Sequence, residues 1–206
     1  MMKNNTPYVA LLGDAVASRR LAPPERQALL QQIRSVLSTF NRQWRSSVAA
    51  KFTIALGDQF EGLLVAGAPL WDIVHTLRAE LTGDWVIACG RGPLTTALTP
   101  DVLELDGPCF HRAREALEQA KRDRRVLAFG GYDGATVALA SYYSALYWTW
   151  TSRQRQAAAL LRTMEPAAVA ARLGVDRSAV SHLARRMSWR LVESADHAFR
   201  AHLEAL

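Results

Sequence analysis

The chain has 206 residues, half of them hydrophobic, with a net charge of +6 and a sequence pI of about 9.8. This composition allows a sizeable core in one large domain, or in a medium domain with a small one attached, and its basic balance favours polyanionic partners. Cys89 and Cys109 lack metal-ligand spacing, so we expect two buried, reduced thiols in a cytoplasmic protein. Residues 1–7 are polar and lack an apolar segment, so we expect no secretory signal.

The first 131 residues alternate between strand-like and helix-like patterns. In chain order, the predicted elements are strand 8–12, helix 24–44, strand 51–56, strand 60–65, helix 69–81 and strand 85–91. A further helix over 107–121 and a strand over 125–129 follow. The order β-α-β-β-α-β is that of the ferredoxin-like fold, in which helices cover one face of an antiparallel sheet. The predicted class is therefore α+β.

Residues 134–152 form a run of 19 residues without a charged side chain. That length would suffice to span a bilayer. The Ser, Thr and Tyr residues distributed through the run favour a buried connecting or dimer-forming helix instead. We therefore predict three segments, namely a domain over 1–131, a connecting and dimerisation helix over 132–150 and a second domain over 151–206. The expected protein is a homodimer without a membrane segment.

Residues 166–186 have the spacing of a helix-turn-helix. Ala170 supplies a small residue where two helices cross, Gly174 suits a turn that needs a positive φ, and Val180 supplies the apolar contact that seals the pair. Asp176 or Ser178 suits the start of the second helix. An ordinary helical hairpin on a basic face is the alternative. The pattern predicts an all-α helix-turn-helix domain at the C-terminal end.

The charge distribution extends this prediction to double-stranded DNA. Residues 151–206 contain nine arginines and five acidic residues, against 16 basic and 14 acidic residues in the rest of the chain. Arginine suits phosphate and guanine contacts through its planar guanidinium group. The outward face of the second helix would contact DNA through Arg177, Ser178, Ser181, His182, Arg185 and Arg186.

Two Gly-Asp pairs mark the N-terminal region. Asp14 follows the first predicted strand, and Asp58 lies at the turn between the second and third strands. In a ferredoxin-like sheet these two points are neighbours, and two adjacent carboxylates repel unless a divalent cation such as Mg²⁺ joins them. Ser18 and Arg19, just after Asp14, suit a polyphosphate. The alternative is that both aspartates are ordinary turn residues.

Four motifs in order, LLGDAVASR, KFTIALGDQFEGLL, CGRGPLTT and DGPCFHRAREAL, resemble the SatD family over about residues 8–117. Domains of that family are similar to class III nucleotidyl cyclases and GGDEF diguanylate cyclases, which share a palm-like fold. The resemblance implies metal ligands at Asp14 and Asp58, and we add Arg112 and Arg114 as candidate nucleotide contacts. A diguanylate cyclase has Gly and Glu where this chain has Leu56 and Gln59.

A second departure from the related families lies near Arg114. Class III cyclases have Asn four residues before the catalytic Arg, whereas this chain has Phe110 four residues before Arg114.

The main functional prediction is a DNA-binding transcriptional regulator whose cyclase-like domain senses a nucleotide or another anion. The alternative is a Mg²⁺-dependent nucleotidyl cyclase or nucleotidyltransferase that its helix-turn-helix directs to DNA. A third hypothesis is a protein-interaction module with a degenerate palm domain.

Overall fold

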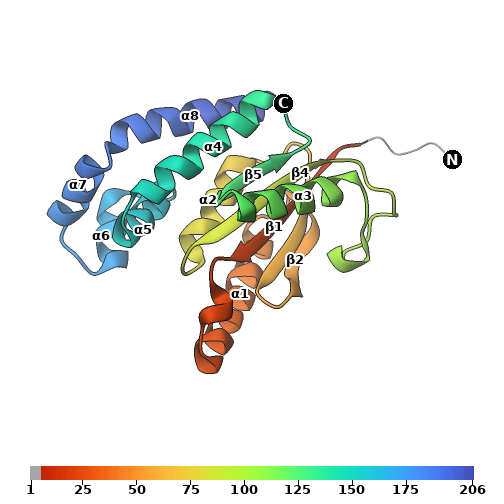
Figure 1. Cartoon of the computed structure of the whole chain (residues 1–206), viewed down its shortest axis with the longest axis horizontal. Helices are drawn as coiled ribbons and strands as arrows, with labels where there is room; N and C mark the ends of the chain where they lie inside the picture. The colour runs from red at the N-terminus through yellow and green to blue at the C-terminus, as the bar shows by residue number, and fades with distance from the viewer. Residues whose placement is uncertain (1–5) are drawn as a thin grey trace. The chain divides into compact units, whose positions relative to one another are not determined.

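The structure is a computed structural model that describes residues 6–206 (Figure 1). Within these residues the chain divides into two compact units. Unit 1 contains the chain up to Ala68 and the segment Leu81–Ser144, and unit 2 contains Pro69–Glu80 and Ala145–Leu206. Each unit has its own hydrophobic core, so each is described by itself.

Unit 1 is built on one five-stranded sheet with the strand order β2-β3-β1-β4-β5. The strands are β1 (Tyr8–Ala15), β2 (Val48–Leu56), β3 (Gln59–Val65), β4 (Trp85–Gly92) and β5 (Leu127–Gly130). The first four pair antiparallel in the order expected of a ferredoxin-like β-α-β-β-α-β chain, and β5 joins β4 in parallel. The predicted α+β class is confirmed, and the strand predicted over 125–129 is β5, which lies outside the four-strand ferredoxin-like order.

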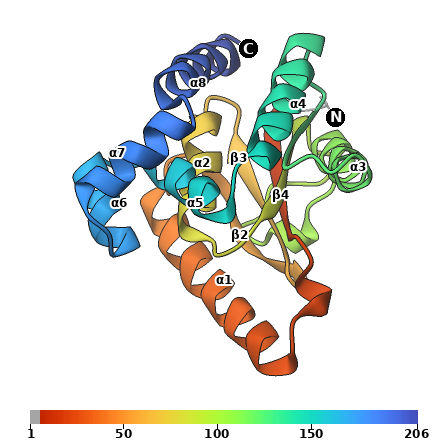
Figure 2. The same ribbon diagram turned by 60° about the vertical axis from the view of Figure 1, so that its left-hand side comes forward.

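Helices cover both faces of this sheet, whereas the ferredoxin-like plan predicted that they cover one (Figure 2). On one face, Phe40 of α1 (Pro23–Gln43) packs against Phe52 of β2, with ring centroids 4.8 Å apart. On the other face, Phe110 of α3 (Pro108–Arg122) joins the core that contains Leu12 of β1. The reason is that β1 is apolar on both sides and its central residues are buried, so each side needs a cover.

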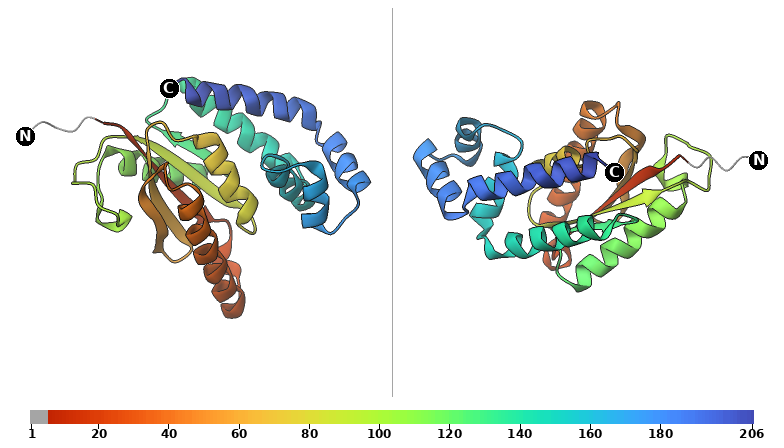
Figure 3. Two further views of the ribbon diagram at one scale, coloured as in Figure 1. Left: turned by 180° about the vertical axis from the view of Figure 1, so that it is seen from behind. Right: turned by 90° about the horizontal axis from the view of Figure 1, so that it is seen from above.

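Unit 2 is helical (Figure 3). Its helices are α2 (Leu70–Glu80), α5 (Ser152–Leu161), α6 (Pro166–Leu173), α7 (Arg177–Arg186) and α8 (Trp189–Glu204). Thr151 begins α5 with a capping box, because its hydroxyl accepts from the Gln154 amide and the Gln154 side chain accepts from the Thr151 amide. Gly174 ends α6 with a φ of 62°. Val169, Ala170 and Val180 lie in one buried cluster that joins α6 to α7.

The uncharged run of the sequence forms α4 (Gly134–Thr149). One side of this helix is buried through Ala140, Tyr143 and Tyr147, while Tyr142 is 78% exposed. The buried Ser144 hydroxyl donates to the Ala140 carbonyl and accepts from the Val126 amide, which explains a polar residue on the buried side. Among residues 6–206, no helix has both the length and the apolarity that a membrane crossing requires. The homodimer expected through this helix stays a prediction.

Candidate active site

A pocket of about 840 Å³ lies in unit 1, at the end of β1 and beside the turn between β2 and β3. Its volume is within the usual range for small-molecule sites, roughly 300–1,000 Å³. Four residues that the sequence analysis selected lie around it, namely Asp14, Ser18, Arg19 and Asp58. Further polar side chains come from Arg20, Arg26, Gln59, Glu118 and Lys121. The pocket therefore combines carboxylates with cationic groups.

Asp14 lies inside β1, which continues to Ala15, so this Gly-Asp pair belongs to a strand rather than to a turn. Residues alternate between the faces of a strand, so Asp14 shares the α3 side with Leu12. There the Lys121 ammonium is 2.8 Å from Asp14 Oδ2. The same oxygen accepts a hydrogen bond from the Gln59 side-chain amide. Asp14 is thus held by one cation and one neutral donor.

Lys121 is the site residue that sequence reasoning missed. Its ammonium also lies 3.1 Å from Glu118 Oε1, one turn back on α3. Partial burial alone would lower the pKa of Lys121, but the hydrogen bonds to Asp14 and Glu118 outweigh it and raise the pKa above its usual value. The side chain is therefore positively charged. A signal was present, because only three of the 25 basic residues in this chain are lysines.

Asp58 lies in the β2–β3 turn, where Gly57 has a φ of 59°. Its Oδ2 atom is buried and has no hydrogen-bond partner among residues 6–206. A carboxylate oxygen in this state is costly and marks a place where an ion or another donor is expected. The two aspartates thus differ, since Asp14 has internal partners and Asp58 retains an unsatisfied oxygen.

A divalent cation fits the donors of this pocket. The described residues contain no group of three or more His, Cys, Asp or Glu side chains that could hold a metal ion alone. Mg²⁺ is commonly bound through one or two carboxylates, with water and phosphate oxygens completing its shell. The unsatisfied oxygen of Asp58 and the carboxylate of Asp14, on the same pocket, match this donor set.

The segment after β1 borders the pocket with an unusual backbone. Ala17 has a φ of 61° and a ψ of 16°, a left-handed conformation that costs a residue with a side chain of order 1–3 kcal/mol. It leads into the short 3₁₀ helix η1 (Ser18–Arg20), whose Ser18 is only 7% exposed. The Arg26 guanidinium donates to the Arg19 carbonyl at 3.3 Å, which ties α1 to this segment. Strain of this kind concentrates at functional sites.

Arg112 and Arg114, the other predicted nucleotide contacts, lie at a different pocket of about 670 Å³ beside α3 and β5. Arg112 donates to the Arg91 carbonyl at 2.7 Å. Arg114 lies 3.6 Å from Oε2 of Glu61, a residue that is only 8% exposed. Burial raises the pKa of Glu61, and the nearby Arg114 partly offsets that rise. The structure therefore does not bring these arginines to the pocket of Asp14 and Asp58.

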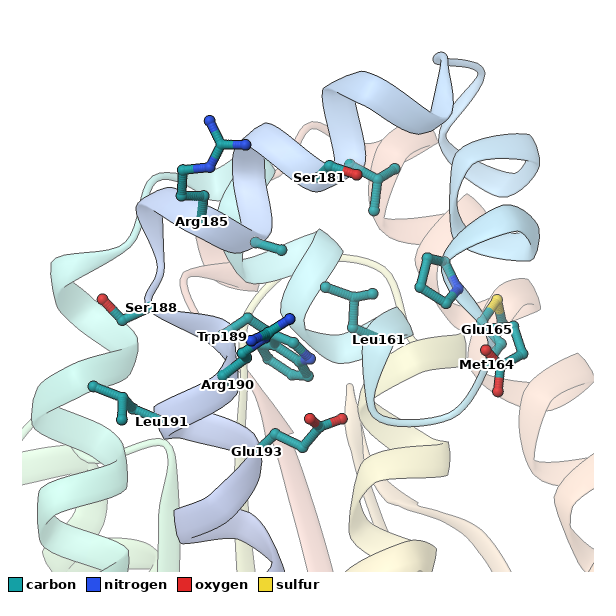
Figure 4. Close-up of a pocket in the computed structure, with 13 residues that line it drawn as sticks. Leu161, Met164, Glu165, Ser181, Arg185, Ser188, Trp189, Arg190, Leu191 and Glu193 are labelled. Carbon is teal, nitrogen blue, oxygen red and sulfur yellow. The ribbon is translucent and has the colours of Figure 1, made fainter.

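The six predicted DNA contacts all lie on α7 in unit 2 and are exposed. Ser181 and Arg185 border a groove of about 750 Å³ whose apolar lining includes Leu161 and Trp189. Figure 4 shows the Arg185 side chain pointing away from Leu161 and Trp189. The remaining predicted contacts are Arg177, Ser178, His182 and Arg186.

Most arginines of unit 2 make contacts inside that unit. Arg162 pairs with Asp196 at 2.7 Å, Arg172 pairs with Glu80 at 2.9 Å, and Arg200 pairs with Asp72. Two more donate to backbone carbonyls: Arg153 to Leu173 and Arg155 to Trp150. The excess of arginine in this part of the chain therefore largely joins helices to one another.

Comparison with known proteins gives a family and a set of loosely similar structures. A family model described as "SatD family" matches residues 8–140, while no curated protein matches the chain. A bacterial light-regulated adenylyl cyclase is similar with a TM-score of 0.44 and 15% identity, over 60% of this chain and 75% of that one. The monomeric guanylyl cyclase domain of the RhoGC fusion protein from the aquatic fungus Blastocladiella emersonii has a TM-score of 0.42 and 17% identity, over 55% and 75%. A rhodopsin-guanylyl cyclase catalytic core with converted specificity, in complex with ATPalphaS, has a TM-score of 0.41 and 16% identity, over 55% and 72%.

These findings correct the main functional prediction. The prediction of a DNA-binding transcriptional regulator is wrong, because the family match covers residues 8–140, outside the predicted helix-turn-helix, and no comparison supports a DNA-binding regulator. The physical reason is that the two signals behind it were not specific. Local arginine density arises here from internal ion pairs, and a glycine turn between two packed helices also forms an ordinary helical pair.

Proposed function

The chain belongs to the SatD family, and from this premise we propose that its pocket binds a nucleoside triphosphate with a divalent cation, for nucleotidyl cyclisation or nucleotidyl transfer. All residues that line the pocket lie within the matched segment 8–140. The proposal therefore concerns the part of the chain that defines the family.

The unsatisfied Oδ2 atom of Asp58 is the observation that carries this proposal. It lies at a pocket where Arg19, Arg20, Arg26 and Lys121 provide positive charge. A cation-binding carboxylate next to four cationic side chains is the arrangement that a metal-bound polyphosphate needs, because the metal and the cations share the phosphate charges. A neutral ligand would leave the Arg19 and Arg20 side chains without an anionic partner among residues 6–206.

The residues have distinct roles in this proposal. Asp58 and Asp14 would hold the cation, which when bound would polarise phosphoryl oxygens. The Arg19 and Arg20 guanidinium groups would hold phosphate oxygens through paired hydrogen bonds. The buried Ser18 hydroxyl would donate to a phosphate oxygen near Asp14. The attacking hydroxyl would come from the same nucleotide in a cyclase and from a second substrate in a transferase.

The test is to incubate the full chain with each of ATP, GTP, CTP and UTP in Mg²⁺ or Mn²⁺ and to measure pyrophosphate release and the product mass. We expect release with at least one nucleotide, a cyclic or transferred product, and loss of release in Asp58→Asn. Metal-dependent nucleotide binding without pyrophosphate release would reduce the site to a binding function. Absence of both binding and release would overturn the proposal.

A further inference from the structure

The pocket already contains a cation that belongs to the chain. The Lys121 ammonium is 2.8 Å from Asp14 Oδ2 and 3.1 Å from Glu118 Oε1, so it lies on the carboxylate that a metal would use. The side chains of Lys121 and Asp14 are only 29% and 18% exposed, so solvent screens this pair incompletely. A free divalent cation that approaches Asp14 must therefore displace an ammonium or share an already neutralised carboxylate.

We infer that Lys121 is an internal competitor of the divalent cation, which keeps free metal off Asp14 and admits the metal only together with a polyphosphate. This inference rests on the proposed function. The positive charge of Lys121 repels a free metal ion. A polyphosphate is negatively charged, so the same ammonium group can form an ion pair with it. The side chain is a flexible stem with a compact charge, and it can turn from one oxygen to another within the pocket.

The neighbouring groups agree with this role. Gln59 also donates to Asp14 Oδ2, so this oxygen keeps a neutral partner when the ammonium leaves. Glu118, one turn back on α3, also pairs with Lys121, and its own side chain is 58% exposed. Asp58 has no such competitor, since its buried Oδ2 lacks a partner in the part of the chain that the structure describes. Metal affinity should thus depend on Lys121 through Asp14.

The experiment compares the parent, Lys121→Met and Lys51→Met by titration with Mn²⁺ alone and with Mn²⁺ plus ATP, followed by paramagnetic resonance of free Mn²⁺ and by calorimetry. Methionine keeps the apolar stem of Lys121 and removes its charge. Lys51 is an exposed lysine on β2 outside the pocket, so Lys51→Met controls for the loss of one positive charge. Circular dichroism of each variant verifies that it is folded.

We expect Lys121→Met to bind Mn²⁺ alone about tenfold more tightly than the parent and Mn²⁺-ATP about tenfold more weakly, while Lys51→Met resembles the parent. If Lys121→Met binds Mn²⁺ alone no more tightly than the parent, while the parent binds Mn²⁺-ATP, the inference is overturned and the proposed function stands. If neither the parent nor Lys121→Met binds Mn²⁺ or Mn²⁺-ATP, both are overturned. Tighter Mn²⁺ binding by Lys121→Met with no pyrophosphate release from any nucleotide would support the inference and remove the enzymatic part of the proposed function.

Discussion

The two units of this protein differ in how their arginines are partnered. In unit 2, arginines such as Arg162 and Arg172 pair with acidic residues of the same unit. In unit 1, the Arg19 and Arg20 side chains border a pocket that also holds a carboxylate oxygen without a partner among residues 6–206, while Lys121 of that pocket is paired with Asp14 and Glu118. Unit 2 has the higher local arginine density, yet unit 1 has the better candidate site. Charge that lacks an internal partner is therefore a better guide to function than charge density along the sequence.

The largest expected effect concerns the buried ion pair of unit 2. Arg162→Met should lower the free energy of unfolding by about 3–5 kcal/mol, because it leaves Asp196 buried without its cation. The Arg162 and Asp196 side chains are only 4% and 11% exposed. Urea denaturation, followed by tryptophan fluorescence, measures the change. Arg186→Met, at an exposed arginine of α7, is the control. Equal midpoints for the two variants would refute the structural role of Arg162.

The next effect is a dependence of stability on pH that arises from His75 of α2. Burial, together with Arg162, Arg78 and Arg200, lowers the pKa of His75 well below 6.5. The unfolded chain therefore takes up this proton first as the pH falls. Stability should be complete above pH 6.5 and should decrease below it, by up to about 1.4 kcal/mol per pH unit.

His75→Phe tests this origin, because it keeps a ring next to Trp71, whose ring centroid is 4.3 Å from that of His75. The variant should lose most of the acid-side slope when urea unfolding is measured between pH 7 and pH 5. If the parent and the variant have the same slope, the pH dependence arises from other groups.

A smaller effect should separate the two aspartates of unit 1. Asp58→Asn should keep or gain up to about 1 kcal/mol of stability without metal, because the buried Oδ2 atom of Asp58 has no hydrogen-bond partner among residues 6–206. Asp14→Asn should lose about 1 kcal/mol, because it weakens the ion pair with Lys121. Thermal melting in chelator measures both, and melting in Mn²⁺ should raise the Tm of the parent more than that of Asp58→Asn. Identical behaviour of the two variants would contradict the difference between the aspartates.

The smallest effect is expected on α7. Arg177→Ala, Ser181→Ala and Arg185→Ala should each change the free energy of unfolding by less than about 0.5 kcal/mol, because these side chains are exposed. Among residues 6–206, the hydrogen bond of these three side chains is the one that the Ser181 hydroxyl donates to the Arg177 carbonyl within the same helix. A loss above 1 kcal/mol in any of them would show that α7 contributes to the core through that side chain.

The sequence predicted the strands and helices of unit 1 because their apolar patterns are local. It also predicted that Asp14 and Asp58 are neighbours, because the ferredoxin-like strand order places the end of β1 beside the β2–β3 turn, and both residues border the same pocket. It did not predict that α3 covers the second face of the sheet. That arrangement depends on how the chain returns from β4 to β5, which apolar periodicity does not specify.

The contacts of Lys121 and Gln59 with Asp14 could not be predicted from the sequence either. Lys121 lies in the last turn of a helix far along the chain from Asp14, and a charged residue in such a position is usually exposed. In the sequence, Gln59 is only a departure from the diguanylate cyclase pattern, yet in the structure its side chain donates to Asp14. Pairing between side chains of distant elements requires the packing of α3 on the sheet, and local patterns contain no information on it.

The two Gly-Asp pairs look alike in the sequence, but they constrain evolution and protein engineering differently. Gly57 has open space around it and needs only its positive φ, so Asn or Asp could replace it in a homologue. A Cβ atom on Gly13 would lie 2.2 Å from the Phe60 ring. Positions 13 and 60 should therefore change together, with a larger residue at 13 accompanied by a smaller one at 60. A sequence profile that searches for proteins with this pocket should therefore treat positions 13 and 60 as a coupled pair. It should allow Gly, Asn and Asp at position 57.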